Sequence, residues 1–364
     1  MKDELFSPGE RFRGFVVERL LGKGGIGAVY LVRHEMLDTL YALKVLDPEI
    51  ASSNPTYVKR FLREAKIAAR IRHPNLVSVN ECGYDQERGL YFLVMDYVPG
   101  GDLRGALAFS GKFAPEAAAR IVAQVASALQ AAQAYHVVHR DIKPENIILQ
   151  SDGKVKLVDL GIAKAENIDD SLKTTTESVF GTPTYVSPEQ ATNAADVDLR
   201  ADIYSLGIVF FEMLTGKAPY SGKNPAQVLA HIMCEDATPD PRDFDPTVPA
   251  PFAVLIRRMT MKDRDRRLAS FDRVLEELAK LGCDMGLSVP VKGELTPTES
   301  GNDDGLGIDL EKLPEGKDTL SFDTDDPQVK EFVAKLKRRR MLRKVGFAAA
   351  VAAAVAAILL IVFW

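Results

Sequence analysis

Residues that could carry out chemistry are concentrated near the middle of the chain. Two short apolar runs, 147–149 and 155–158, flank a Ser-Asp-Gly turn signal, and this pattern predicts a β-hairpin. An antiparallel hairpin brings its open ends together, so Asn146 before the first strand and Asp159 after the second are expected to meet. Side-chain oxygens placed in this way suit Mg²⁺, which prefers one or two protein oxygens together with substrate phosphates.

Two charged residues lie on the segment that leads into this hairpin. Asp141 supplies a carboxylate and Lys143 supplies an ammonium group. A base that orients a hydroxyl, a cation that offsets phosphate charge and oxygen ligands for a metal are the parts that phosphoryl transfer requires. The segment therefore predicts a phosphoryl-transfer site.

The stretch 139–161 also resembles the catalytic and metal-binding loops of eukaryotic-type protein kinases. The resemblance implies ATP as the phosphate donor, with Mg²⁺, or Mn²⁺ in its place, held by Asn146 and Asp159. It implies that Asp141 orients the acceptor hydroxyl and that Lys143 stabilises phosphate charge. Lys143 also favours serine and threonine over tyrosine as acceptors.

The resemblance implies a bilobal protein kinase fold of the α+β class over residues 10–282. The expected N-lobe, at about 10–98, has five strands and one helix, and the C-lobe, at about 99–282, is mainly helical. Apolar periodicity places the C-lobe helices at 114–135, 199–214, 225–234, 250–259 and 271–281. The first of these is apolar all round, which indicates a buried helix.

The N-terminal part reads as strands around a glycine-rich turn at 22–27. In a dinucleotide-binding fold such a turn opens a helix, whereas the residues after it are β-branched and aromatic, so they predict a hairpin. Its glycines would let the backbone approach phosphates closely. By resemblance, the nucleotide-binding residues come from this hairpin, the next strand and the hinge between the lobes: Leu21, Gly22, Lys23, Gly24, Gly25, Ile26, Gly27, Ala28, Val29, Ala42, Lys44, Met95, Asp96 and Val98.

Lys44 lies inside the apolar run 41–46, where a lysine that merely extends to the surface would be ordinary. A helix is predicted to begin at Pro55, and Glu64 lies on it between two basic residues. By resemblance, Glu64 pairs with Lys44 and aims it at the α and β phosphates. Further strands are expected at 77–82 and 90–98.

About twenty polar residues after the hairpin resemble the kinase activation segment, which ends at Ser187-Pro188-Glu189. Thr174 and Thr176 are expected phosphorylation sites. By resemblance, Arg140 receives the loop phosphate through charge-assisted hydrogen bonds, and Thr182 bridges the catalytic aspartate and lysine.

Two further residues are assigned by the same resemblance. Asp202, at the start of a predicted helix, is expected to brace the catalytic loop, and Arg267 is expected to pair with Glu189. His136 and His139 do not predict a metal site, because no third ligand follows at metal-site spacing.

Some positions depart from the family pattern. Leu160 replaces the usual phenylalanine and Ser187 the usual alanine, and both occur in bacterial members of the family. The resulting prediction is a bacterial serine/threonine kinase that acts on proteins and phosphorylates its own activation segment. The resemblance leaves room for a homodimer that does so in trans. A pseudokinase scaffold that binds nucleotide at the membrane and a small-molecule kinase are the alternatives.

Composition narrows the class of protein. The chain has 364 residues, of which 46% are hydrophobic and 27% charged, which is ordinary for a globular protein. The net charge of −5 gives no electrostatic footprint for nucleic acid. Three widely spaced cysteines predict a reduced cytosolic domain without structural disulfides or zinc.

The C-terminal part has a different composition. Residues 291–326 carry eleven acids against three lysines, so 283–326 is expected to be a disordered linker or an acidic strip that docks on the kinase. A basic juxtamembrane helix is predicted at 327–345. The uncharged segment 346–364 predicts a transmembrane helix, with a buried or interfacial helix as the alternative. By the positive-inside rule, the protein would be a single-pass inner-membrane protein with a cytoplasmic kinase domain, and its basic cluster could touch anionic lipid.

Overall fold

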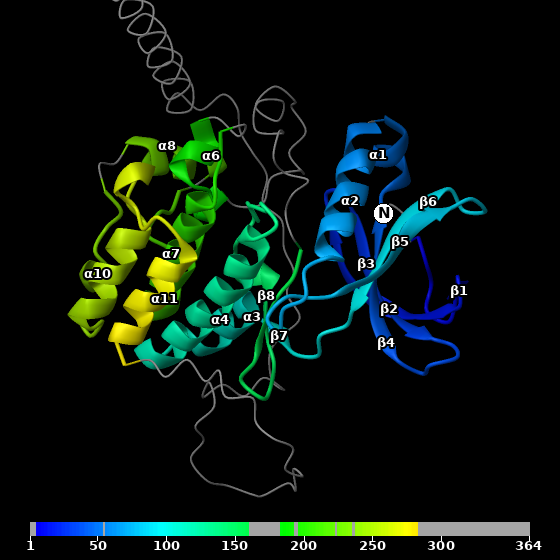
Figure 1. Ribbon diagram of the computed structural model, residues 1–364, viewed down its shortest axis with the longest axis horizontal. Helices are drawn as coiled ribbons and strands as arrows, with labels where there is room; N and C mark the ends of the chain where they lie inside the picture. The colour runs from blue at the N-terminus through cyan, green and yellow to red at the C-terminus, as the bar shows by residue number, and fades with distance from the viewer. Residues whose placement is uncertain are drawn as a thin grey trace, which may run out of the picture.

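The computed structural model describes residues 5–53, 55–159, 183–192, 196–222, 224–234 and 237–282 (Figure 1). Thr174, Thr176, Thr182 and Leu160 lie outside the described residues, as do the predicted linker 283–326, the juxtamembrane helix 327–345 and the transmembrane segment 346–364. The helices within the described ranges include none that is both long and apolar enough to cross a membrane.

The N-lobe is built on one antiparallel sheet with the strand order β1-β2-β3-β4-β6-β5. Its strands are β1 (Arg11–Phe12), β2 (Phe15–Gly24), β3 (Gly27–His34), β4 (Leu40–Leu46), β5 (Val79–Asp85) and β6 (Leu90–Asp96). The five expected strands are present. The two-residue strand β1 is an addition, because the N-terminal segment pairs with β2 at the edge of the sheet.

Strand β4 shows how this sheet directs its side chains. Successive residues point to opposite faces, so Leu43 and Val45 are buried in the aromatic cluster on the outer face. Phe6 and Phe12 of the N-terminal segment cover the same cluster. Ala42 belongs to the other core, which continues into the C-lobe. Lys44 is therefore directed towards the other lobe.

Two helices pack on the N-lobe, α1 (Pro48–Ser53) and α2 (Pro55–Ala68), whereas the sequence predicted one. The prediction missed α1 because six residues are too few for apolar periodicity. A local signal is present, since the carboxylate of Asp47 accepts a hydrogen bond from the N–H of Glu49 (2.8 Å).

The C-lobe helices are α3 (Leu103–Ser110), α4 (Pro115–Gln133), α6 (Pro188–Thr192), α7 (Arg200–Thr215), α8 (Pro225–Cys234), α9 (Pro241–Phe244), α10 (Ala250–Met259) and α11 (Phe271–Lys280). The five predicted helices are confirmed with nearly the expected bounds. Helix α4 is buried on most of its surface, as its alanine-rich and uniformly apolar sequence predicts. Helix α7 is buried throughout most of its length and forms the centre of the lobe.

The predicted hairpin lies where the two lobes meet (Figure 1). Strands β8 (Ile147–Leu149) and β9 (Val155–Leu157) pair in antiparallel register, and β7 (Gly101–Asp102) adds a third strand. Gly153 occupies the turn with φ of +77°, which favours glycine.

The same hairpin is tied to the N-lobe through its backbone. The N–H of Leu157 donates to Asn75 O (2.8 Å) and the N–H of Val77 donates to Leu157 O (3.1 Å). The side-chain amide of Asn75 also donates to Val155 O (2.8 Å). The segment after α2 is therefore fastened to β9.

Candidate active site

The open ends of the β8–β9 hairpin meet, as the sequence predicts. The N–H of Val158 donates to Asn146 O (2.9 Å), which closes the hairpin immediately beside Asp159. Asn146 ends the short 3₁₀ helix η1 (Pro144–Asn146) and is buried. Asn146 and Asp159 therefore lie on adjacent strand ends although twelve residues separate them in the sequence.

Asn146 is held in one orientation by Asp141. Its Nδ2 donates to Asp141 O (2.8 Å) and to Asp141 Oδ2 (3.0 Å). The ammonium of Lys143 lies 3.1 Å from the same Oδ2. Since the amide nitrogen faces Asp141, the amide oxygen of Asn146 is the atom left to ligate a cation.

Lys44 reaches this group of residues from strand β4. Its Nζ lies 2.7 Å from Asp159 Oδ1, and the lysine side chain is only 12% exposed. Burial raises the pKa of Asp159, but the neighbouring ammonium of Lys44 lowers it further, and the net pKa is below the ordinary value. Asp159 is thus held as a carboxylate. The side chain of Glu64, on α2, lies outside the described residues, so its pairing with Lys44 stays a prediction.

The backbone before Asp141 is braced by Asp202 at the start of α7. The N–H of His139 donates to Asp202 Oδ2 and the N–H of Arg140 donates to Oδ1, each at 2.7 Å. Burial raises the pKa of Asp202 to about 7, although both backbone donors favour its charged form. Asp202 is placed as the sequence predicted.

Two non-glycine residues at the site have positive φ angles, Arg140 (+64°) and Asp159 (+54°). Such backbone conformations cost about 1–3 kcal/mol each and persist where the surroundings hold them. Neither conformation was predicted, and they lie at Asp159 itself and at the residue before Asp141.

The glycine-rich turn forms the hairpin between β2 and β3. The last paired residues are Gly24 and Gly27, and Gly22 and Gly24 are exposed with no close neighbour where a Cβ would lie. Gly27 differs, because a Cβ there would lie 2.0 Å from Val45 O. The close approach of β4 therefore requires glycine at position 27, whether or not this residue also contacts a phosphate.

The expected hinge follows β6. Met95 is buried and pairs with Ala42 across the sheet, which places both predicted nucleotide-site residues side by side. The N–H of Asp96 donates to Ser78 O (2.9 Å), so adenine contacts in this segment cannot use that N–H. Val98 lies two residues further on and is partly exposed.

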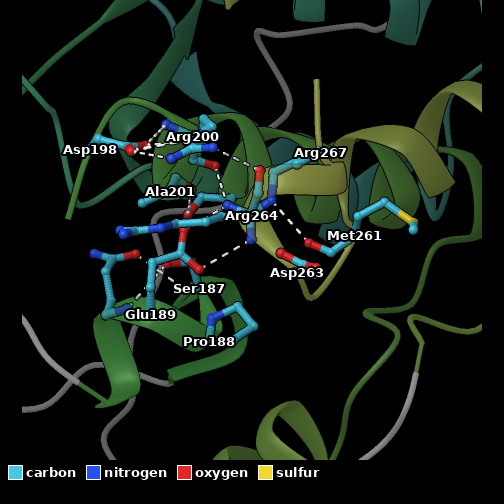
Figure 2. A network of polar contacts seen from close by, with 12 residues as sticks. Ser187, Pro188, Glu189, Asp198, Arg200, Ala201, Met261, Asp263, Arg264 and Arg267 are labelled. Carbon is cyan, nitrogen blue, oxygen red and sulfur yellow. Dashed lines mark hydrogen bonds and ion pairs between the residues drawn. The ribbon is translucent and has the colours of Figure 1, made fainter. Parts of the chain in front are cut away.

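Glu189 and Arg267 form the predicted ion pair (Figure 2). Two guanidinium nitrogens donate to the two carboxylate oxygens at 2.6 and 3.1 Å, and the arginine side chain is fully buried. Arg267 also donates to Met261 O (3.0 Å). Arg264 donates to the backbone and side chain of Asp196.

A second polar network, which extends from the buried Glu212 and Tyr185 to the exposed Glu145, was not predicted. Arg104 of α3 lies 2.7 Å from Glu212 of α7 and 3.0 Å from Glu145 of η1, and it also donates to the hydroxyl of Tyr185. Burial, together with Glu212, raises the pKa of Tyr185 well above its ordinary value, so this tyrosine is a neutral donor to Glu212. The four residues of this network come from four separate elements, and no regular spacing in the sequence connects them.

Comparison with known proteins agrees with this geometry. The protein kinase domain family matches residues 15–278. The chain is 38% identical over 257 residues to the serine/threonine-protein kinase PrkC of Bacillus subtilis, covering 70% of this chain and 38% of that protein. It is 38% identical over 269 residues to the serine/threonine-protein kinase PknH of Mycobacterium tuberculosis, covering 73% of this chain and 42% of the relative.

Solved structures give the same result. The kinase domain of Mycobacterium tuberculosis PknI is 28% identical and superposes with a TM-score of 0.60, covering 77% of this chain and all of that domain. The match to the curated relatives spans less than half of their length. Together with the family match over residues 15–278, these similarities show that the chain belongs to the protein kinase family.

Proposed function

We propose that this protein transfers the γ-phosphoryl group of ATP to serine and threonine hydroxyls of proteins. The observation that carries the proposal is the meeting of Asp141, Asn146 and Asp159 with two lysines at the mouth of the β8–β9 hairpin. The relatives named above as serine/threonine-protein kinases support the acceptor class.

The residues present fit a nucleotide with a divalent cation. The amide oxygen of Asn146 and the carboxylate of Asp159 are hard oxygen donors, which suit Mg²⁺ or Mn²⁺. When bound, the cation would neutralise charge on the nucleotide phosphates. Lys44, which is largely buried beside Asp159, would hold the α and β phosphates.

The acceptor side of the site depends on Asp141. Its carboxylate receives bonds from Asn146 and Lys143 on Oδ2, which fixes its orientation. Asp141 would accept a hydrogen bond from the acceptor hydroxyl and so direct the hydroxyl oxygen towards the γ-phosphate. It would also take up the proton that the hydroxyl loses. Lys143 would offset the negative charge that develops on the transferred group. Because none of these groups is missing, the pseudokinase alternative is disfavoured.

Regulation and location complete the proposal. One protomer of a homodimer would phosphorylate Thr174 and Thr176 of the other, and these phosphates would then bind Arg140 of their own chain. Thr182 would help to bridge Asp141 and Lys143. The uncharged segment 346–364, next to the basic cluster 335–344, supports a single inner-membrane span that keeps the kinase domain in the cytoplasm and the cluster near anionic lipid. Fractionation of cells that express the chain with and without residues 346–364 tests this anchor. The shorter chain should no longer be found in the membrane fraction, and equal membrane association of the two chains would contradict the anchor.

The activity is tested with the full-length chain, radiolabelled ATP, Mg²⁺ and myelin basic protein as the acceptor. Phosphoamino acid analysis should find label on serine and threonine. The matched variant Asp159→Asn keeps the size of the side chain but removes the carboxylate, and it should transfer almost none. Equal labelling by both proteins, or label mainly on tyrosine, would refute the proposal.

A further inference from the structure

Ser187 and Gln190 bond reciprocally at the start of α6. The N–H of Gln190 donates to Ser187 Oγ (3.3 Å), and the N–H of Ser187 donates to Gln190 Oε1 (3.1 Å). This arrangement is a capping box, and both residues are buried. A helix of five residues is unstable by itself, so the box joins the Gln190 side chain rigidly to α6. It also gives a structural reason for serine in place of the usual alanine.

The other end of the Gln190 amide reaches the catalytic loop. Since Oε1 faces Ser187, Nε2 is directed away from it and donates to Arg140 O (3.0 Å). That carbonyl belongs to the peptide that joins Arg140 to Asp141. The N–H of the same peptide donates to His139 Nδ1 (3.3 Å). Both polar groups of this peptide are therefore bonded.

The peptide needs such support because of its conformation. Arg140 has φ of +64°, which a residue with a side chain seldom adopts unless its surroundings hold it. Asp202 holds the N–H groups on one side of the residue, and Gln190 holds the carbonyl on the other. Rotation of the peptide would break bonds on either side.

We infer that Gln190 is a positioning residue that fixes the Arg140–Asp141 peptide and thereby the direction in which Asp141 presents its carboxylate. The inference rests on the proposed function, since it concerns the same site. The neutral amide accepts from Ser187 and donates to Arg140 O at the same time, which an ionised carboxylate cannot do. A carboxylate at this position would keep the first bond and would place an oxygen against the carbonyl.

This difference defines the test. Full-length wild type and Gln190→Glu are compared for kcat and for the KM of Mg-ATP, with myelin basic protein as the acceptor. At pH 8 the variant should lose about tenfold in kcat, because small displacements of a reacting group are costly. The KM for ATP should stay within about twofold, because the nucleotide contacts do not involve Gln190. Ser187→Ala is the matched control, since it keeps the Ser187 N–H, and it should lower the melting temperature while kcat stays near that of wild type.

The pH profile separates positioning from a general loss of structure. Burial at this position should raise the pKa of the introduced carboxyl, and in its protonated form that carboxyl can again donate to Arg140 O, so the ratio of variant to wild-type kcat should rise as the pH falls from 8 to 6. The charged groups around it, Arg140, Asp141, Asp202, Glu189 and Arg267, are present in every variant, so Gln190→Met, which adds no carboxyl, measures what they contribute to the ratio. Gln190→Met removes the donor without adding charge, and its ratio should be low at every pH.

The outcomes are distinct. A wild type that transfers no phosphate overturns the proposed function and this inference with it. An active wild type with Gln190→Glu and Gln190→Met equal to it at every pH overturns the inference alone. Equal losses of kcat in Ser187→Ala and the Gln190 variants would also overturn it, because they would indicate that stability of α6 is what matters.

Discussion

Two loops border the candidate active site and are held in different ways. In the catalytic loop, the backbone on both sides of Arg140 is bonded by Asp202 and Gln190, and the side chain of Asn146 is bonded to Asp141. The glycine-rich turn is exposed at residues 22–25 and is carried by strand pairing that ends at Gly24 and Gly27. The residues expected to orient the hydroxyl are therefore held in place before substrate binds, whereas the turn expected to meet the phosphates is left accessible.

Arg267→Ala should have the largest effect, because α6, which carries Gln190 to the catalytic loop, would lose its anchor. The change should lower the free energy of unfolding by about 3–5 kcal/mol, since it leaves the largely buried carboxylate of Glu189 without its partner. Arg264→Ala is the control, because its partner Asp196 is 71% exposed, and it should cost less than about 1 kcal/mol. Denaturant unfolding measures both. Similar losses in the two variants would contradict the anchoring role of Arg267.

Lys44→Met tests the connection between the lobes at Asp159. The change should lower kcat/KM for ATP by about 100-fold, because it removes a preorganised cation from a partly buried site. Lys66→Met, on the exposed face of α2, is the matched control and should leave kcat/KM unchanged. Steady-state kinetics measure both variants. An equal, small effect of the two changes on kcat/KM would contradict a role for Lys44 in binding the phosphates of ATP.

Asp202, which braces the catalytic loop, should make the stability of the protein depend on pH. Burial raises its pKa from 3.8 to about 7, so the folded protein holds this proton more tightly than the unfolded chain. The stabilisation is complete below about pH 4 and is lost as the pH rises through about 7. Between pH 5 and 8, the free energy of unfolding should fall by about 2–3 kcal/mol more in wild type than in Asp202→Asn. Parallel curves for the two proteins would show that Asp202 is already ionised at pH 5.

Gly24→Ala should have the smallest effect, and it tests the exposed glycine-rich turn. The nearest atom to an added Cβ is Gly27 O at 4.0 Å, so stability should be unchanged while the KM for ATP rises about two- to fivefold through hindered phosphate approach. Gly27→Ala should instead destabilise the protein by about 1–3 kcal/mol, because its Cβ would collide with Val45 O. Melting curves and ATP titrations distinguish the two glycines, and matching behaviour would contradict their separate roles.

Much of the fold could be predicted from the sequence because its signals are local. The β8–β9 hairpin follows from two apolar runs around a turn, and α8 and α10 follow from apolar periodicity bounded by proline. The meeting of Asn146 and Asp159 was predictable for the same reason. The roles of Asp202 and Arg267 came from family resemblance, since neither has a distinctive local pattern.

The features that escaped prediction depend on contacts between distant segments. Gln190 could have been noticed as the last residue of a Ser-x-x-Gln capping box, but its bond to Arg140 O required the fold. The positive φ angle of Arg140 has no counterpart in residue preference, and aspartate only tolerates the positive φ of Asp159 rather than requiring it. The network around Arg104 joins elements more than a hundred residues apart and left no pattern to detect.

The central claim is that Asp141 is held ready to act on the acceptor hydroxyl while other residues bind the nucleotide. Its most direct test is Asp141→Asn in the full-length chain, with Mg-ATP binding measured by calorimetry and phosphate transfer measured with myelin basic protein. The dissociation constant for Mg-ATP should stay within about threefold of the wild-type value, while kcat should fall by about 1,000-fold. A variant that retains more than about a tenth of wild-type kcat, at unchanged ATP affinity, would contradict it.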